Sequence, residues 1–335
     1  MADAPDAPSQ DAQGGGRREP GTFLGRRFPP NLFSIPFGIA GLADVWAAAR
    51  PILHNSIVVC NTLYIAAAAL WAIIVVLYFG QGLRRMRTDA RDPVLGPFVS
   101  LAVITPTLLS AVLAPYAFQA ARVLVSIFIA LTVIFAGWMT GQWVAAPLDV
   151  DAAHPGYFLP SAAGGFIAAF AAEGVHLHLL SEVMFGLGVL SWVLLGSLLL
   201  FRLFFRPMLP TALVPTLAIE LAPPVVAGVA YYALSGGRTD TFAAGLAGYA
   251  LLMGFVQLRF IPLYAKLHLS PATWAFGFTY AAAANDALFW IQARRPSGAT
   301  AYAAVTVALT TILIGAIALF TASALVRGRF LPKPA

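Results

Sequence analysis

Three carboxylates stand inside long apolar stretches of the sequence, as Asp44, Glu220 and Asp286. A carboxylate is costly to place in lipid, so such residues are candidates for an ion or proton pathway. Asp44 and Asp286 are expected near the ends of their stretches, within reach of interfacial water. Glu220 lies deeper, three residues before Pro223. It is expected in irregular backbone, either coupling proton movement to a substrate or acting as a hydrogen-bonding partner inside the protein.

Prolines form a second pattern. Proline removes one backbone N–H and kinks a helix, and in lipid the freed carbonyl needs a protein partner or a watery cavity. Prolines fall inside the first, third, fifth and seventh apolar spans, as Pro36, Pro106, Pro160, Pro215, Pro223 and Pro224. The second, fourth, sixth and tenth spans have none in their interiors. The alternation favours odd spans as an inner ring and even spans as an outer wall, although prolines are tolerated wherever membrane helices pack.

Other kinds of chemistry have little support. All five histidines fall in loops or at span ends, and His176 and His178 do not share a helix face. The single cysteine, Cys60, excludes an internal disulfide and a cysteine-based zinc site. The chain shows no nucleophile and base arrangement, phosphate-binding loop or dinucleotide fingerprint. We therefore expect no enzyme activity, no metal and no cofactor.

The composition explains where the apolar stretches belong. Of 335 residues, 60% are hydrophobic and 10% are charged, whereas soluble domains have about 45–50% and about 25%. Too few charges remain to cover a water-facing surface. The net charge of +6 does not indicate nucleic acid, because the basic residues lie in short loops beside apolar spans.

The spans predict an all-α polytopic membrane protein. A helix needs about 20 residues to cross the hydrocarbon, and these stretches are too long and too uniformly apolar for barrel strands. The ten spans, grouped as five helical hairpins, are 32–49, 57–80, 94–114, 118–144, 157–174, 178–202, 211–234, 242–262, 271–291 and 299–326. The membrane domain is thus predicted at 32–326. A disordered N-terminal tail, 1–31, precedes it and a short C-terminal tail, 327–335, follows it.

The distribution of basic residues predicts the topology. With the N-terminus in the cytoplasm, fifteen of the twenty Lys and Arg residues fall on the inside and five on the outside. Cytoplasmic loops carry such an excess. We expect an inner (plasma) membrane protein with both termini cytoplasmic. The loop at 145–156 has no Lys or Arg and is the weakest part of this assignment.

Four segments resemble one known family. They are FPPNLFSIPFGIAGLADVW at 28–46, GYFLPSAAGGFIAA at 156–169, ELAPPVVAGVAYYAL at 220–234 and SPATWAFGFTYAAAA at 270–284. In order, they are similar to the first, fifth, seventh and ninth helices of the tellurite-resistance/C4-dicarboxylate transporter family, which includes bacterial TehA and the plant slow-type anion channels. The resemblance extends over roughly residues 28–326.

The resemblance implies a specific architecture and gate. Family members have ten helices, with a pore lined by the odd helices in each protomer, and the bacterial member is a homotrimer. A phenylalanine of the ninth helix closes the pore, and Phe278 matches it, with Phe276 beside it. Members often have proline after that ring. Here the position is Thr279, whose hydroxyl can bond back to a helix carbonyl and bend the helix.

The family also implies the class of substrate. Its plant members conduct chloride and nitrate, while other relatives carry malate or export sulfite. Because no Lys or Arg lies in the centre of a span, the expected attraction comes from the positive ends of broken helices, about 0.3–1 kcal/mol each. The leading interpretation is an anion channel that favours weakly hydrated anions such as nitrate. The alternative is a proton-coupled transporter or exporter of C4-dicarboxylate, sulfite or tellurite, with Glu220 as the coupling group. Membrane lipids are the other expected partner.

Overall fold

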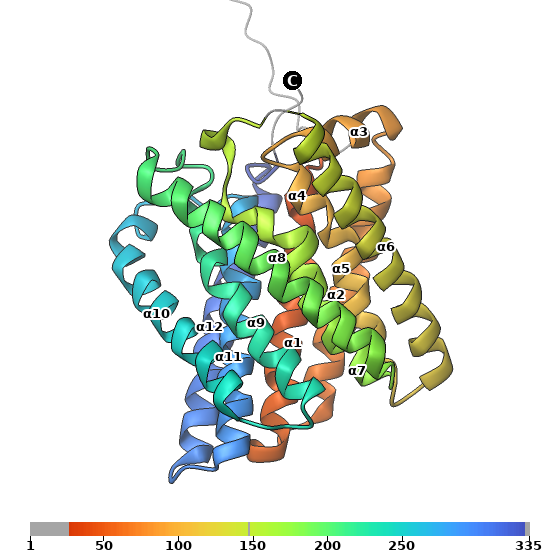
Figure 1. Ribbon diagram of the computed structural model, residues 1–335, viewed down its shortest axis with the longest axis vertical. Coiled ribbons are helices and arrows are strands. Elements are labelled where there is room, and N and C mark those ends of the chain that lie inside the picture. The colour runs from red at the N-terminus through yellow and green to blue at the C-terminus, as the bar shows by residue number, and fades with distance from the viewer. Residues whose placement is uncertain (1–26, 147, 332–335) are drawn as a thin grey trace, which may run out of the picture.

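The computed structural model describes residues 27–146 and 148–331, a part of the chain that is helical and contains no strand (Figure 1). Residues 1–26 of the predicted N-terminal tail and 332–335 of the C-terminal tail lie outside it. The remaining tail residues pack against the bundle. The backbone of Phe28 exchanges two hydrogen bonds with the Gln81 side chain, and Arg27 pairs with Asp89 at 2.6 Å.

Within the described residues, seven helices are long and apolar enough to cross a membrane, as expected for an all-α polytopic membrane protein. Two of them join a 3-10 helix to an α-helix: Pro30–Leu53 consists of η2 (Pro30–Phe33) and α1 (Ser34–Leu53), and Val214–Leu234 of η6 (Val214–Leu221) and α9 (Ala222–Leu234). The other five are α2 (Ile57–Phe79), α6 (Phe118–Ala145), α8 (His178–Phe205), α10 (Thr241–Tyr264) and α12 (Ala299–Val326).

The three remaining predicted spans are built from shorter pieces, so the count of ten stays a prediction. Span 94–114 contains α4 (Gly96–Val99) and α5 (Leu101–Ala111). Span 157–174 contains the second half of η4 (Pro155–Phe158), then η5 (Leu159–Ala163) and α7 (Gly164–Gly174). Span 271–291 contains η7 (Pro271–Trp274) and most of α11 (Ala275–Arg294).

Two short helices were not predicted. The polar helix α3 (Leu83–Arg91) connects the second and third spans and carries four arginines, while η3 (Val150–Ala152) lies in the loop after α6. The prediction concentrated on long apolar stretches, and neither segment is one.

The helices fall into an inner and an outer set. The inner helices are α1, α5, α7, α9 and α11. Each packs against the next inner helix along the chain, and α11 packs on α1, so the five helices form a closed ring. The outer helices α2, α6, α8, α10 and α12 are single elements of 23–28 residues. In their apolar windows only 17–28% of residues are buried, against 72% for the inner spans that contain α1 and α9.

Each inner α-helix follows a short helical segment. The segment is a 3-10 helix before α1, α9 and α11, the π-helix η5, itself preceded by η4, before α7, and the four-residue helix α4 before α5. These segments carry proline at their first or second position, at Pro30, Pro97, Pro155, Pro160, Pro215 and Pro271. Proline suits a helix start, since its missing N–H is not needed there. Pro36, Pro223 and Pro224 stand in the first turn of their α-helices, so most predicted kinks are instead changes of helix type at the start of a helix. Pro106 alone among the predicted prolines lies inside its α-helix.

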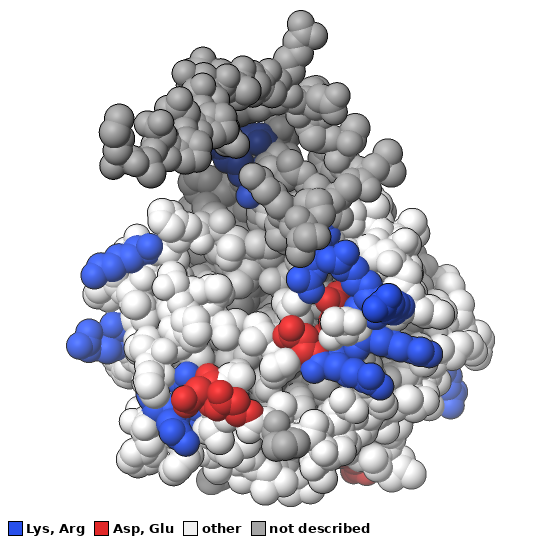
Figure 2. All heavy atoms as spheres, turned by 90° about the horizontal axis from the view of Figure 1, so that it is seen from above, with Lys and Arg blue, Asp and Glu red and all other residues white. Residues whose placement is uncertain are grey.

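The two ends of the bundle differ in charge. We call the end at which the described chain begins and ends the terminus face, and the other end the opposite face. Seen from above, the terminus face carries several groups of Lys and Arg side chains around its margin (Figure 2). The four arginines of α3, at positions 84, 85, 87 and 91, are exposed.

Candidate functional site

A first cavity lies within the inner ring toward the terminus face. Its volume is about 30 Å³, and its lining is almost entirely apolar. Every inner span contributes to the wall of this terminus-side cavity. The lining residues are Ser34, Phe37, Phe98, Leu101, Phe158, Leu159, Ala163, Ile219, Ala222, Pro223, Val226, Trp274, Ala275, Phe278 and Thr279.

A second cavity follows it toward the opposite face. This far cavity has a volume of about 20 Å³. Its lining residues are Gly41, Asp44, Leu108, Ile167, Phe170, Val226, Val229, Phe278, Ala281, Ala282 and Asn285. All come from the five inner helices, and no described residue of the five outer helices lines either cavity.

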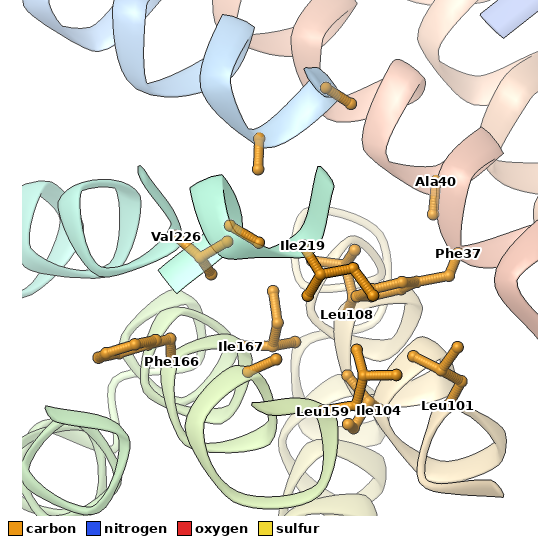
Figure 3. Close-up of a cluster of buried hydrophobic side chains, with 14 of the residues drawn as sticks. Phe37, Ala40, Leu101, Ile104, Leu108, Leu159, Phe166, Ile167, Ile219 and Val226 are labelled. Carbon is orange, nitrogen blue, oxygen red and sulfur yellow. The ribbon is translucent and has the colours of Figure 1, made fainter. Parts of the chain in front are cut away.

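Phe278 lies between the two cavities. Its side chain lines both, as does Val226. The ring stacks on Phe37 of α1, with 3.6 Å between the ring centroids and 12° between the planes. Figure 3 shows Phe37 with Leu108 and Ile219, among apolar side chains that approach one another from several inner elements. The two stacked rings thus lie in an apolar setting, and only the Phe278 ring borders both cavities.

Small residues allow α1 and α11 to approach closely enough for this stack. A Cβ added to Gly38 would lie 2.9 Å from the Trp274 side chain. A Cβ added to Gly41 would lie 3.0 Å from Cβ of Ala281 and 3.2 Å from the Phe278 ring. The glycines of α1 thus set the position of the ring by leaving room for it.

Neither cavity is lined by a lysine or an arginine. Helix starts gather around the terminus-side cavity instead. Its lining includes the first residues of four inner α-helices, Ser34, Leu101, Ala222 and Ala275, and the residue before α7, Ala163. The N-terminal end of a helix carries a partial positive charge and favours an anion by about 0.3–1 kcal/mol. Four of these starts donate their first N–H to the preceding segment, so any positive potential that they add to the cavity is weak.

The predicted site residues do not all come together. Phe278, Thr279 and Pro223 line the terminus-side cavity. Phe276 instead packs against Tyr264 and Tyr280, with centroid distances of 4.8 and 6.0 Å. Four of the predicted prolines are buried but line neither cavity, namely Pro36, Pro106, Pro160 and Pro224.

Thr279 does not bend its helix in the expected way. α11 continues through it from Ala275 to Arg294, and among the described residues no hydrogen bond links its hydroxyl to the preceding turn. The interruption of this span comes earlier, where the 3-10 helix η7 changes to α11.

Glu220 lies in irregular backbone, as predicted, because it belongs to the 3-10 helix η6. It is 6% exposed and its Oε1 has no hydrogen-bond partner. It lines neither cavity. A direct contact with a substrate in those spaces would therefore require η6 to rearrange.

Two polar residues in the far cavity were not recognised as a pair from the sequence. Asp44 accepts a 2.7 Å hydrogen bond from the Tyr64 hydroxyl of α2. Asn285 is 5% exposed, and its Oδ1 has no partner. The sequence did contain a signal for Asn285, because it is a polar residue that stands next to Asp286 inside an apolar span. Asp286 itself contacts Gly228 and lines a separate groove between α9, α10 and α11.

The loop before the fifth span holds the one buried histidine. His154 accepts a hydrogen bond from the Gly156 N–H and bonds the Val94 carbonyl at 3.1 Å. Burial lowers its pKa to about 4, so the ring is neutral near pH 7. Among the described residues, no three His, Cys, Asp or Glu side chains gather as a metal site would require.

Two comparisons with known proteins bear on this arrangement. A family model described as a voltage-dependent anion channel matches residues 27–325. The chain is also similar to the tellurite resistance protein TehA homolog of Haemophilus influenzae. The two are 28% identical over 309 residues, which cover 91% of this chain and 93% of that protein.

Proposed function

Because the chain belongs to the voltage-dependent anion channel family, we propose that it passes small monovalent anions, such as chloride and nitrate, or related oxyanions, through the middle of its inner ring. One observation carries the proposal: Phe278 separates two cavities that are lined only by residues of the inner spans. An ion that moves along the ring axis meets this side chain.

Phe278 acts as the gate. A phenyl ring in a narrow apolar passage blocks an ion sterically and keeps water out, so the ion would have to lose its hydration shell. Phe37 stabilises the closed position through the ring stack. Opening moves Phe278 off Phe37 and connects the two cavities.

The helix starts around the terminus-side cavity provide the attraction for anions. They act as weak, spread-out positive charge, and weak binding lets an ion leave as well as enter. Without a strong cation to replace lost water, the cost of dehydration dominates selection. Nitrate is therefore expected to pass more readily than chloride.

The proposed setting is the inner (plasma) membrane, with ten spans and with both termini in the cytoplasm. The basic groups on the terminus face support this orientation. Each protomer carries its own pathway, and a homotrimer is the expected assembly by family resemblance.

A second candidate is suggested by the name of the relative, which concerns tellurite resistance. Tellurite, sulfite and C4-dicarboxylates are anions that the same passage could carry, and a proton-coupled carrier could use Glu220. A channel carries current without a proton gradient, whereas a coupled carrier moves protons with its substrate. Current recorded at equal pH on both sides separates the two candidates.

The test of the gate is anion flux into proteoliposomes containing the native chain, Phe278→Ala or Phe276→Ala. Phe276 is the matched control, since it lies two residues away on α11 and packs outside both cavities. We expect a strong increase in chloride and nitrate flux for Phe278→Ala alone. Equal flux in all three proteins would refute the gate, and flux that needs a proton gradient would favour the coupled carrier.

A further inference from the structure

The far cavity has an unusual pair of polar residues for an anion pathway. Asp44 and Asn285 face it from α1 and α11, while the other lining side chains are apolar. A charged carboxylate in this space repels an anion at close range, where the low dielectric strengthens the effect. The cavity can therefore hold an anion easily only when that charge is removed.

The hydrogen bonds of Asp44 leave room for a proton. Tyr64 donates to Oδ1 at 2.7 Å. In the part of the chain that the structure describes, no hydrogen bond to Oδ2 is recorded. A protonated Asp44 would keep the Tyr64 bond on one oxygen and place an O–H donor on the other.

Asn285 supplies the second indication that something polar binds here. The residue is 95% buried, since its exposed fraction is 5%, and its Oδ1 lacks a partner. A buried amide without partners is costly, and a bound water or anion could satisfy it. The amide group can donate N–H bonds to an anion, and its oxygen can accept one from a protonated partner.

The surroundings provide no cation in the cavity that would hold Asp44 in its charged form. α2 contributes Tyr64 and Cys60, and the exposed Arg50 of α1 is within electrostatic range of Cys60. From α5, α7 and α9 the cavity receives only Leu108, Ile167, Phe170, Val226 and Val229. On α11, Asp286 contacts Gly228 and lines the other groove.

We propose that the far cavity is an anion-binding subsite that fills when Asp44 carries a proton, with Asp44 and Asn285 both donating hydrogen bonds to the anion. The proton comes from the solution at the opposite face and returns there when Asp44 ionises. Acid at that face then raises anion flux. The inference rests on the proposed function, because it concerns the same pathway.

The experiment uses Phe278→Ala as the background, so that the ring does not limit flux. Nitrate flux into proteoliposomes is measured with equal pH on both sides, from about pH 8 to about pH 5, a range in which a buried carboxyl can titrate. We expect nitrate flux to be about tenfold higher at about pH 5 than at about pH 8, because protonation removes the charge of Asp44 that excludes the anion. Adding Asp44→Asn should give high flux at every pH.

A matched carboxylate serves as control. Glu182 is exposed at the start of α8 and lies 3.5 Å from His178, away from both cavities. Glu182→Gln should keep the pH response. Tyr64→Phe leaves the carboxyl in place but removes a donor to its charged form, so the midpoint of the response should move to higher pH.

The outcomes separate the two proposals. A pH response that persists in Asp44→Asn, or low flux of that variant at every pH, overturns the role of Asp44. If Asp44→Asn does not fold, an unmoved midpoint in Tyr64→Phe overturns it instead. Absence of chloride and nitrate flux from Phe278→Ala at every pH overturns the proposed function itself.

Discussion

The inner and outer helices have similar apolar compositions but differ in the continuity of the helix and in burial. The outer helices are single, unbroken elements with mostly exposed side chains, whereas each inner α-helix follows a proline-bearing segment of another helix type. A helix that faces lipid has no water or neighbour to satisfy a freed backbone group, but a helix that faces protein or a cavity has both. Interruptions therefore mark the spans that surround the two cavities.

The strongest test of this comparison places a proline in an outer helix. Leu194 lies in the middle of α8 and is 72% exposed. Leu194→Pro should destabilise the protein by about 3 kcal/mol or more and reduce the yield of monodisperse protein in detergent. Leu194→Ala is the control and should be close to native. A normal yield for the proline variant would contradict the distinction between the two sets.

The seam between α1 and α11 gives the next largest effect. Gly38→Ala would place a methyl group 2.9 Å from Trp274, and overpacking of this kind costs about 1–3 kcal/mol. In the outer helix α6, nothing lies within 4 Å of a Cβ added to Gly137. Gly137→Ala should be neutral or stabilising by about 0.5–1 kcal/mol. Thermal unfolding in detergent checks both, and equal shifts would refute the argument.

His154, in the loop before the fifth span, should make the stability of the protein depend on pH. Its pKa is lowered to about 4 by burial, so the unfolded chain binds a proton more readily than the folded one. Stability is therefore lost as the pH falls from about 6.5 toward about 4, by about 1–2 kcal/mol at about pH 5. His154→Gln should flatten that part of the stability profile. An unchanged profile of unfolding temperature against pH would show that His154 does not contribute.

The smallest expected effect concerns Phe37, whose ring stacks on Phe278. Phe37→Ala removes the stack but leaves the Phe278 ring, the proposed gate, in place. Anion flux should increase a few-fold, less than for Phe278→Ala, because loss of an aromatic pair worth about 0.5–1.5 kcal/mol favours the open position. Phe166→Ala, in the core but outside both cavities, should not raise flux. If it does, the increase reflects general loosening.

Much of the fold could be predicted because the membrane requires long apolar segments. The predicted spans 57–80 and 118–144 agree with α2 and α6 to within one residue at each end. The polar helix α3 was missed, since its arginines give no apolar signal. The prolines identified four of the five inner spans. Most of these prolines stand where helices begin and change type, a distinction that depends on backbone hydrogen bonds.

The candidate site was only partly predictable. Resemblance selected Phe278 among 24 phenylalanines, whereas its stack on Phe37 joins residues far apart in the chain. Asp44 was expected near interfacial water, and its place on the wall of the far cavity with Asn285 was not foreseen. Glu220, the expected coupling residue, lies outside both cavities. Composition shows that a carboxylate is inside a span, but it does not show which way the side chain faces.

The amino-acid sequence alone determined that this is an all-α membrane protein and that four of its spans carry interior prolines. Both follow from local physics, because hydrophobicity and the missing N–H of proline act wherever those residues stand. Only the tertiary structure decided which side chains share a space. The ring of inner helices turns Phe278 and Asp44 toward the middle and Phe276 and Asp286 away from it. Such facing depends on how each helix is rotated against its neighbours, and packing between distant segments sets that rotation.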